Sequence, residues 1–323
     1  MTVVGISFQV RPDLSPFVVC SYYQRERAES MAKIGKFSSA AGEARFRAAY
    51  DAVAARWPVP STEHEVPTSF GSTYVRKSGR GSGAPIALLP GIGGNGQVWY
   101  PFVEELARDH VVLTPDVIGW AGRCEQTAPV RDTADIARWF ADTLDGLGVE
   151  RVHLAGNSLG AWLAGAVAVH RSDRLASLTL LEPSAGVFAR PRLGLLAKFI
   201  VSGINPTPER MRQFNRWLMP RYEMDDAGIE LAGAIAKFRM AMPWDRTFTD
   251  AQLAAIAAPT LVLFGAETVV ADPEFGAARA REGIARAQAE IMPGVGHDLL
   301  WANPEQVIPR FLAFVESHEQ ARA

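Results

Sequence analysis

The sequence predicts an α/β protein built on a mostly parallel sheet with helices on both faces. Short apolar runs alternate with segments of helical periodicity from residue 86 onward, and this alternation is typical of βαβ units. One strand leads directly into a glycine-rich turn and a helix, and a second glycine-rich loop follows the last predicted strand. The predicted strands are 86–89, 111–114, 152–155, 175–181, 260–264 and 290–292.

Composition limits the classes of function. Of the 323 residues, 48% are hydrophobic, which is enough for a large core, and a net charge of −2 favours no nucleic-acid partner. No apolar run reaches about 18 residues, so we expect no membrane span. The first twenty residues lack a basic segment and contain Pro12 and Asp13, which argues against a signal peptide. Two cysteines, Cys20 and Cys124, are too few for a disulfide framework, so we expect a reducing, cytoplasmic location.

Residues 1–60 are predicted to form an N-terminal extension with one helix. The first 35 or so residues show no clear period, whereas apolar side chains recur at helical spacing from Ser39 onward. Pro58 and Pro60 end this helix, and the stretch 69–77 after it is predicted to form a hairpin or an edge strand. The apolar face of the helix carries Phe46, Tyr50, Val53 and Trp57.

Residues 61–183 and 260–323 carry the strand pattern and form the predicted core, with helices over 98–108, after an Asp132 cap and over 304–316. Residues 184–259 between them lack a strand signal. We interpret this segment as a helical lid over the ends of the strands, whose methionine and aromatic side chains suit an apolar pocket wall or simply form its own core. Four of its apolar residues keep helical spacing, Met211, Phe214, Leu218 and Tyr222, and five more follow: Ile235, Phe238, Met240, Met242 and Trp244.

The turn from Gly156 to Gly160 carries the best candidate for a nucleophile. Its letters are Gly-Asn-Ser-Leu-Gly, between an apolar strand and a helix-forming run. Glycines at both ends permit a sharp bend, which lifts the Ser158 hydroxyl clear of the sheet above the helix N-terminus. The alternative is a glycine-rich connection with an incidental serine, but the strand-turn-helix setting favours the nucleophile.

A serine hydroxyl needs a base to take its proton, and His297 is the best placed of six histidines. It lies in Pro-Gly-Val-Gly-His after the last predicted strand, at the carboxyl edge where parallel sheets bind ligands. A surface-loop histidine is the alternative. For the oxyanion of acyl transfer, we expect backbone N–H donors from Leu159 and from Ile92, which lies between glycines in the loop after strand 86–89.

Three motifs in this order resemble an α/β-hydrolase: Leu-Pro-Gly-Ile-Gly-Gly at 89–94, the elbow at 156–160, and Gly-Val-Gly-His at 294–297. Within that family the chain most resembles small bacterial carboxylesterases with a helical lid, over about 67–317. The resemblance implies a Ser-His-acid triad, no cofactor, and hydrolysis of a carboxylic ester or related acyl bond. A proline, Pro90, replaces the histidine that members often carry before the oxyanion glycine.

The acid of the implied triad is less clearly placed. Members usually carry it three residues after the glycine that ends the seventh strand of the family's fold. Here that glycine is Gly265, after strand 260–264, and the third residue on is Thr268, which cannot hold a negative charge. Glu182, after strand 175–181, is the preferred replacement, because some members place the acid there. Glu267 is the alternative, and Asp272 lies further along the same loop but could instead cap a helix.

A competing motif overlaps the oxyanion loop. Residues 91–96 match Gly-x-Gly-x-x-Gly between a strand and a helix, and Asp116 ends the next strand, as in a dinucleotide-binding site. That interpretation leaves the serine turn and the histidine loop unexplained, so we expect no cofactor. No spacing of histidine, cysteine and carboxylate residues suggests a metal site.

The sequence therefore predicts a serine hydrolase that acts on a largely apolar small ester or acyl compound. The side chains expected to line its pocket are Trp99, Phe214, Leu218 and Phe238. Two other functions remain open: a non-hydrolytic cyclase, lyase or isomerase on the same scaffold, which Thr268 motivates, and an inactive ligand-binding homologue. The sequence makes no prediction of the oligomeric state.

Overall fold

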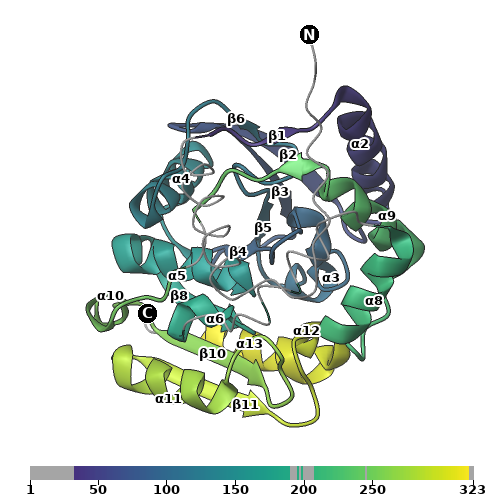
Figure 1. Ribbon diagram of the computed structural model, residues 1–323. Helices are drawn as coiled ribbons and strands as arrows, with labels where there is room; N and C mark the ends of the chain where they lie inside the picture. Colours follow the sequence, from purple (N-terminus) through teal and green to yellow (C-terminus); the bar gives the residue numbers. More distant parts are fainter. Residues whose placement is uncertain (1–32, 190–194, 196–197, 199–206, 244–245, 320–323) are drawn as a thin grey trace.

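The computed structural model describes residues 33–189, 195, 198, 207–243 and 246–319 (Figure 1). Cys20 and Trp244 lie outside this part of the chain. Among the described residues, nine strands form one large sheet. They are β2 (Ser61–Thr68), β3 (Gly71–Ser78), β4 (Ile86–Leu89), β5 (Val112–Pro115), β6 (Glu125–Gln126), β7 (Val152–Asn157), β8 (Leu175–Leu181), β10 (Thr260–Gly265) and β11 (Ala287–Met292).

The strand order is β11-β10-β8-β7-β4-β5-β3-β2, with β6 paired to β3. All pairs from β11 to β5 are parallel, whereas β3 runs antiparallel to β2, β5 and β6. The predicted fold class, a mostly parallel sheet with helices on both faces, is therefore confirmed. The predicted hairpin is the pair β2 and β3, which begins eight residues earlier than the stretch 69–77.

Side chains of the central strands alternate between two apolar cores. In β4, Ile86 and Leu88 belong to one core, and Ala87 and Leu89 belong to the other. The first core packs against α3 (Val103–Leu106) and α13 (Pro304–Glu319). The second packs against α4 (Thr133–Gly146), α5 (Leu159–Arg171) and α11 (Pro273–Gly283). The predicted helix over 98–108 is shorter than expected, because a 3₁₀ turn, η1 (Gly96–Trp99), precedes α3.

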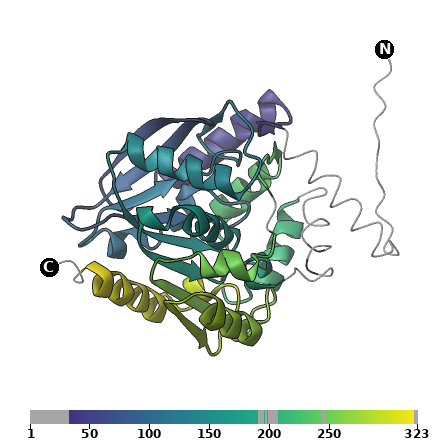
Figure 2. The same cartoon turned by 90° about the vertical axis from the view of Figure 1, so that its left-hand side faces the viewer.

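The segment between β8 and β10 is mainly helical. Helices α8 (Pro208–Leu218) and α9 (Asp226–Ile235) pack on each other, and α9 packs on the N-terminal helix α2 (Ala40–Ala54). Figures 1 and 2 place these helices together at one side of the sheet. A two-residue strand, β9 (Phe238–Arg239), pairs with β1 (Lys36–Phe37), which the sequence did not predict because two residues carry no period.

Helix α2 ties the N-terminal extension to this segment. The Ser39 side chain accepts the N–H of Gly42 and starts the helix. Phe46, Tyr50 and Val53 are buried in a third apolar cluster, which α9 shares. No helix in the described part of the chain combines the length and the apolar character needed to cross a bilayer.

Candidate active site

Ser158 lies at the apex of the turn between β7 and α5. Its φ of 56° and ψ of −119° fall in a region that favours glycine, so the turn holds this serine in a strained conformation. A side chain at Gly156 would place its Cβ 2.2 Å from the Gly160 carbonyl oxygen, and one at Gly160 would place it 2.3 Å from the Pro90 oxygen. Both glycines are therefore required by close backbone approach, and the sharp bend projects the serine side chain from the sheet edge.

Ser158, His297 and Glu182 meet at the carboxyl ends of the strands. Ser158 Oγ is 3.1 Å from His297 Nε2, and His297 Nδ1 is 3.1 Å from Glu182 Oε2. A carboxylate can only accept, so the proton of the neutral imidazole lies on Nδ1 and leaves Nε2 free to accept the serine proton. The second oxygen of Glu182 accepts the N–H of Gly265, which fixes the carboxylate in place.

The three side chains are almost completely enclosed. Ser158 is 7% exposed, His297 4% and Glu182 2%. Glu182 directly follows β8, which lies between β7 and β10, so its carboxylate lies between the serine turn and the end of β10. In an enclosed site of low polarity, a carboxylate stabilises a neighbouring imidazolium more strongly than it does in water.

The other candidate acids lie elsewhere. The Glu267 side chain is 52% exposed and forms an ion pair with Arg221, at 2.6 Å between Oε2 and the guanidinium. Asp272 accepts the N–H of Phe275 and caps α11. Thr268 makes a local hydrogen bond, with its hydroxyl oxygen accepting the N–H of Val270 at 3.4 Å. Of the three acidic candidates, only Glu182 contacts the histidine.

The loop after β4 approaches the serine closely. A Cβ built on Gly91 would lie 3.2 Å from Ser158 Cβ, so the loop backbone borders the turn. Ile92 lines the same pocket as Ser158. Leu159 is the first residue of α5, where an N–H has no partner within the helix. Both expected oxyanion donors therefore belong to segments that border Ser158.

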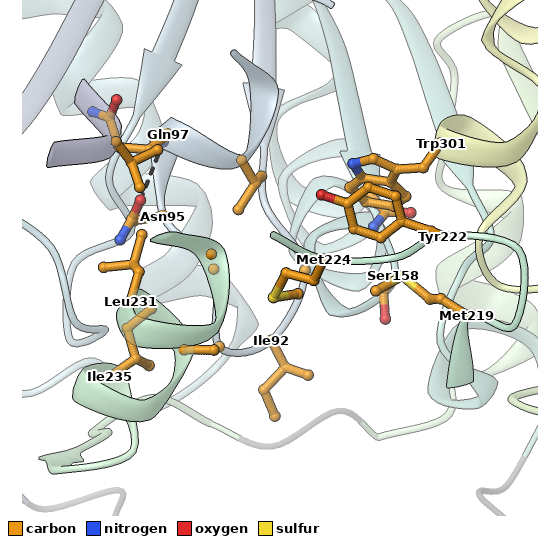
Figure 3. Close-up of a pocket in the computed structure, with 18 of the residues that line it drawn as sticks. Ile92, Asn95, Gln97, Ser158, Met219, Tyr222, Met224, Leu231, Ile235 and Trp301 are labelled. Carbon is orange, nitrogen blue, oxygen red and sulfur yellow. Dashed lines mark hydrogen bonds between the residues drawn. The ribbon is translucent and has the colours of Figure 1, made fainter. Parts of the chain in front are cut away.

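A pocket extends from Ser158 between the loop after β4, the helices α8 and α9, and the end of α2 (Figure 3). It encloses about 1070 Å³ of space, part of which is open to solvent. Figure 3 shows Tyr222 and Trp301 near Ser158, and Leu231, Ile235, Asn95 and Gln97 on the opposite side. Its apolar wall includes Ile92, Val98, Phe214, Leu218, Met219, Met224, Leu231 and Ile235.

Two of the four expected pocket residues do not line this pocket. Trp99 is 2% exposed and packs against Phe102 in the core between α3 and α13. Phe238 belongs to β9, and its ring packs edge-on against Phe37 at a centroid distance of 4.9 Å. Trp99 and Phe238 are aromatic and lie next to segments of the site, but their own side chains pack elsewhere. Phe214 and Leu218 do line the pocket.

Several site residues were not named from the sequence. Asp298 is fully buried, and its carboxylate accepts the backbone N–H groups of Gly296 and Arg221, at 3.2 and 2.6 Å. It therefore joins the histidine loop to the segment between α8 and α9. Its position next to His297 was the only signal in the sequence. Arg56, from the end of α2, lines the pocket and pairs with Asp225 at 2.7 Å.

Asp116, the residue that resembled a ribose-binding acid, has a structural role. Its two oxygens accept the N–H of Gly96 at 2.8 Å and the N–H of Arg123 at 2.7 Å, and Tyr50 donates to it at 3.1 Å. Burial raises its pKa to about 6. The carboxylate oxygens that would bind a ribose therefore already accept hydrogen bonds from protein groups. In the described part of the chain, no three histidine, cysteine or acidic side chains are placed to hold a metal ion.

A second serine, histidine and glutamate lie in a row at the opposite edge of the sheet. His153 contacts Ser177 Oγ at 2.8 Å and Glu319 at 3.2 Å. Ser177 is only 1% exposed and lies within β8, without a turn that would present it to a ligand. Burial lowers the pKa of His153 to about 4. His153 and Glu319 line a separate pocket, but Ser177 does not, whereas Ser158 itself lines its pocket and has backbone donors beside it.

Comparison with known proteins agrees with this geometry. A model of the alpha/beta hydrolase family matches residues 86–310. Carboxylesterase YbfK from Bacillus subtilis (strain 168) is 26% identical over 292 residues, which cover 87% of this chain and 96% of that protein. The uncharacterized carboxylesterase nap from the same organism is 25% identical over 290 residues, covering 84% of this chain and 92% of its own.

Solved structures share the fold. The crystal structure of carboxylesterase CesB (YbfK) from Bacillus subtilis has a TM-score of 0.77 at 26% identity, covering 85% of this chain and 98% of that one. Naproxen esterase from Bacillus subtilis has a TM-score of 0.77 at 24% identity, covering 84% of this chain and 97% of its own. Since the family model spans well over half of the sequence, this protein belongs to the α/β-hydrolase family and is an α/β-hydrolase enzyme, as its ordered motifs predicted.

Proposed function

We propose that this protein is a serine hydrolase that cleaves a carboxylic ester, or a related acyl bond, of a largely apolar small molecule through an acyl-enzyme. The row of contacts from Glu182 through His297 to Ser158, at 3.1 Å each and open to an apolar pocket, carries this proposal. The carboxylesterases among its relatives support an ester as the substrate.

In the proposed mechanism, His297 Nε2 takes the proton of Ser158 Oγ as that oxygen attacks the ester carbonyl. Glu182 stabilises the resulting imidazolium, and the N–H groups of Ile92 and Leu159 bind the oxyanion. Collapse of the tetrahedral intermediate expels the alcohol, which receives the proton from His297. Water then attacks the acyl-enzyme by the same route, which releases the acid and restores the serine.

Helices α8 and α9 act as the lid of this pocket in the proposal, because Phe214, Leu218, Leu231 and Ile235 supply much of its apolar wall. Burial raises the pKa of Tyr222 to about 12, which moves it still further above neutral pH. An apolar wall with few polar groups favours substrates with a hydrocarbon acyl or alcohol part. The non-hydrolytic alternative was considered because Thr268 occupies the usual position of the acid. Glu182 contacts His297 in its place, so no observation favours that alternative.

Pre-steady-state kinetics with p-nitrophenyl butyrate tests the proposal. We expect a burst of p-nitrophenol close to one equivalent per enzyme, because an activated p-nitrophenyl ester acylates the serine faster than water hydrolyses the acyl-enzyme. Ser158→Ala should abolish both burst and turnover. An inert wild type, with no hydrolysis across short and long acyl chains, would contradict the proposal and point to an inactive binding protein.

A further inference from the structure

The pocket contains two buried polar side chains at some distance from the serine. Asn95 and Gln97 are each 1% exposed and line the pocket on the side opposite Ser158 (Figure 3). Asn95 Nδ2 and Gln97 Oε1 have no hydrogen-bond partner among the residues that the structure describes. A buried polar atom without a partner destabilises the fold, so such atoms in a pocket wall indicate a ligand group that completes them.

The orientation of the Gln97 amide follows from its neighbours. Asp116 has a pKa of about 6, so at neutral pH its carboxylate is ionised and can only accept. The Tyr50 hydroxyl donates its single proton to Asp116 at 3.1 Å. Its oxygen must therefore accept from Gln97, and Gln97 Nε2 donates to it at 2.8 Å. The amide nitrogen is thus committed to Tyr50, and Gln97 presents its carbonyl oxygen as an acceptor.

The Asn95 amide is fixed in a similar way. Asn95 is the N-cap of η1, and its Oδ1 accepts the backbone N–H of Gln97 at 3.1 Å. Because a backbone N–H cannot be met by an amide nitrogen, the oxygen stays at the cap and Nδ2 remains the free donor. The wall of the pocket therefore holds one unpaired donor, from Asn95, and one unpaired acceptor, from Gln97, and both atoms are buried.

We propose that Asn95 and Gln97 form a polar subsite that binds a neutral group able to both accept and donate a hydrogen bond, such as a carboxamide or a hydroxyl, on the substrate's end remote from the scissile ester. This inference rests on the proposed function, because it assigns specificity to the same pocket. The subsite favours a neutral group over a charged one: the Asp116 carboxylate behind it disfavours an anion, and an ammonium group could donate to Gln97 but would leave the Asn95 donor unpaired.

The subsite combines elements from distant parts of the chain. Asn95 is the N-cap of η1 and Gln97 lies within it, after β4, whereas Tyr50, which orients Gln97, comes from α2 in the N-terminal extension. Helix α2 lies outside the residues that the family model matches. We therefore infer that the extension shapes substrate choice by holding Gln97 in one orientation.

Esters with matched end groups test the subsite. The test substrates are p-nitrophenyl esters of straight-chain acids in a series of chain lengths. At each length, the far end of the acyl chain carries a carboxamide, an acetyl or an isopropyl group, and each of these groups has three non-hydrogen atoms. At the length that reaches the subsite, we expect kcat/KM for the carboxamide to exceed that for isopropyl at least about tenfold, because isopropyl leaves two buried groups unpaired. A second series with these end groups on the alcohol side, followed by acid release, covers the opposite orientation.

Asn95→Asp provides the matched variant. Aspartate keeps an oxygen for the helix cap but replaces the free donor with an acceptor. The acetyl group can only accept a hydrogen bond, so in the wild type its advantage over isopropyl depends on the Asn95 donor. That advantage should disappear in Asn95→Asp. Asn303→Asp is the control, since Asn303 directly precedes α13 and does not line the pocket; it should keep the wild-type ranking.

Two outcomes would overturn the inference while leaving the proposed function intact. In the first, wild-type enzyme hydrolyses all three end groups within about twofold at every length in both series, which would mean that the polar pair binds only water. In the second, Asn95→Asp keeps the wild-type acetyl-to-isopropyl ratio. Failure of the wild type to hydrolyse any ester would instead overturn the proposed function and the inference with it. The wild-type ranking needs no variant, so the test survives poor folding of Asn95→Asp.

Discussion

Replacement of Glu182 by glutamine separates the two candidate acids and probes the orientation of His297. In the wild type, one oxygen of Glu182 accepts the N–H of Gly265, and the other accepts the Nδ1 proton of His297 at 3.1 Å. In Glu182→Gln, the single amide oxygen stays with the Gly265 N–H, and the amide NH₂ turns toward His297 Nδ1. The imidazole then carries its proton on Nε2, which faces Ser158 and can no longer accept the serine proton.

The expected loss follows from the distance and the burial. Unit charges about 3 Å apart attract by roughly 5 kcal/mol at an effective dielectric constant of about 20, which corresponds to about 10³-fold to 10⁴-fold in rate. Glu267→Gln removes only an ion pair with Arg221 in which both side chains are about half exposed, and such pairs contribute little. We therefore expect kcat to fall about 10³-fold in Glu182→Gln and less than about threefold in Glu267→Gln.

The assay is steady-state hydrolysis of p-nitrophenyl butyrate by both variants, with thermal melts to show that each remains folded. A kcat for Glu182→Gln within about tenfold of the wild type would refute the assignment of Glu182. An equal loss in Glu267→Gln would refute the argument from burial, because it would give an exposed carboxylate the same role as an enclosed one.

Three further predictions concern backbone strain, packing and pH. Ser158→Gly should be inactive yet more stable than Ser158→Ala by about 1 kcal/mol, seen as a higher melting temperature, because glycine tolerates the φ of 56°. Gly160→Ala should lower soluble yield and melting temperature sharply, since its Cβ would lie 2.3 Å from the Pro90 oxygen; unchanged melting would contradict the close approach. Burial lowers the folded-state pKa of His153 to about 4 from 6.5, so its contribution to stability is lost as the pH falls from 6.5 toward 4. As the pH falls from 7.5 to 4.5, the free energy of unfolding of His153→Gln, measured in urea, should therefore rise by about 2 kcal/mol relative to that of the wild type. A difference that does not change with pH would contradict a neutral buried imidazole.

The sequence was sufficient to predict the sheet and the segments that carry the site. The strands of a parallel sheet are short and apolar, and their carboxyl ends share one edge, so Ser158 and His297 could be assigned to the same edge from strand order alone. The acid could not be chosen in the same way. Glu182 and Glu267 both follow strands, and only the packing of β8 between β7 and β10 directs one carboxylate toward the histidine.

The pocket was harder to predict, because its walls come from long-range packing. Trp99 and Phe238 have suitable side chains, but residue type does not reveal that one faces the α3 core and the other faces β1. The role of α2 left no signal beyond its helical period, since its contact with α9 depends on the path of the chain between β8 and β10. Polar residues in a glycine loop, such as Asn95 and Gln97, are common enough that their burial has to be observed.

Covalent labelling with a fluorophosphonate tests the central claim, that Ser158 is an activated nucleophile. Peptide mass spectrometry should find one added phosphonyl group, on Ser158, in the wild type, strongly slowed labelling in Glu182→Gln, and none in Ser158→Ala. Labelling of Ser158→Ala at the wild-type rate, or no labelling of a folded wild type, would contradict the claim.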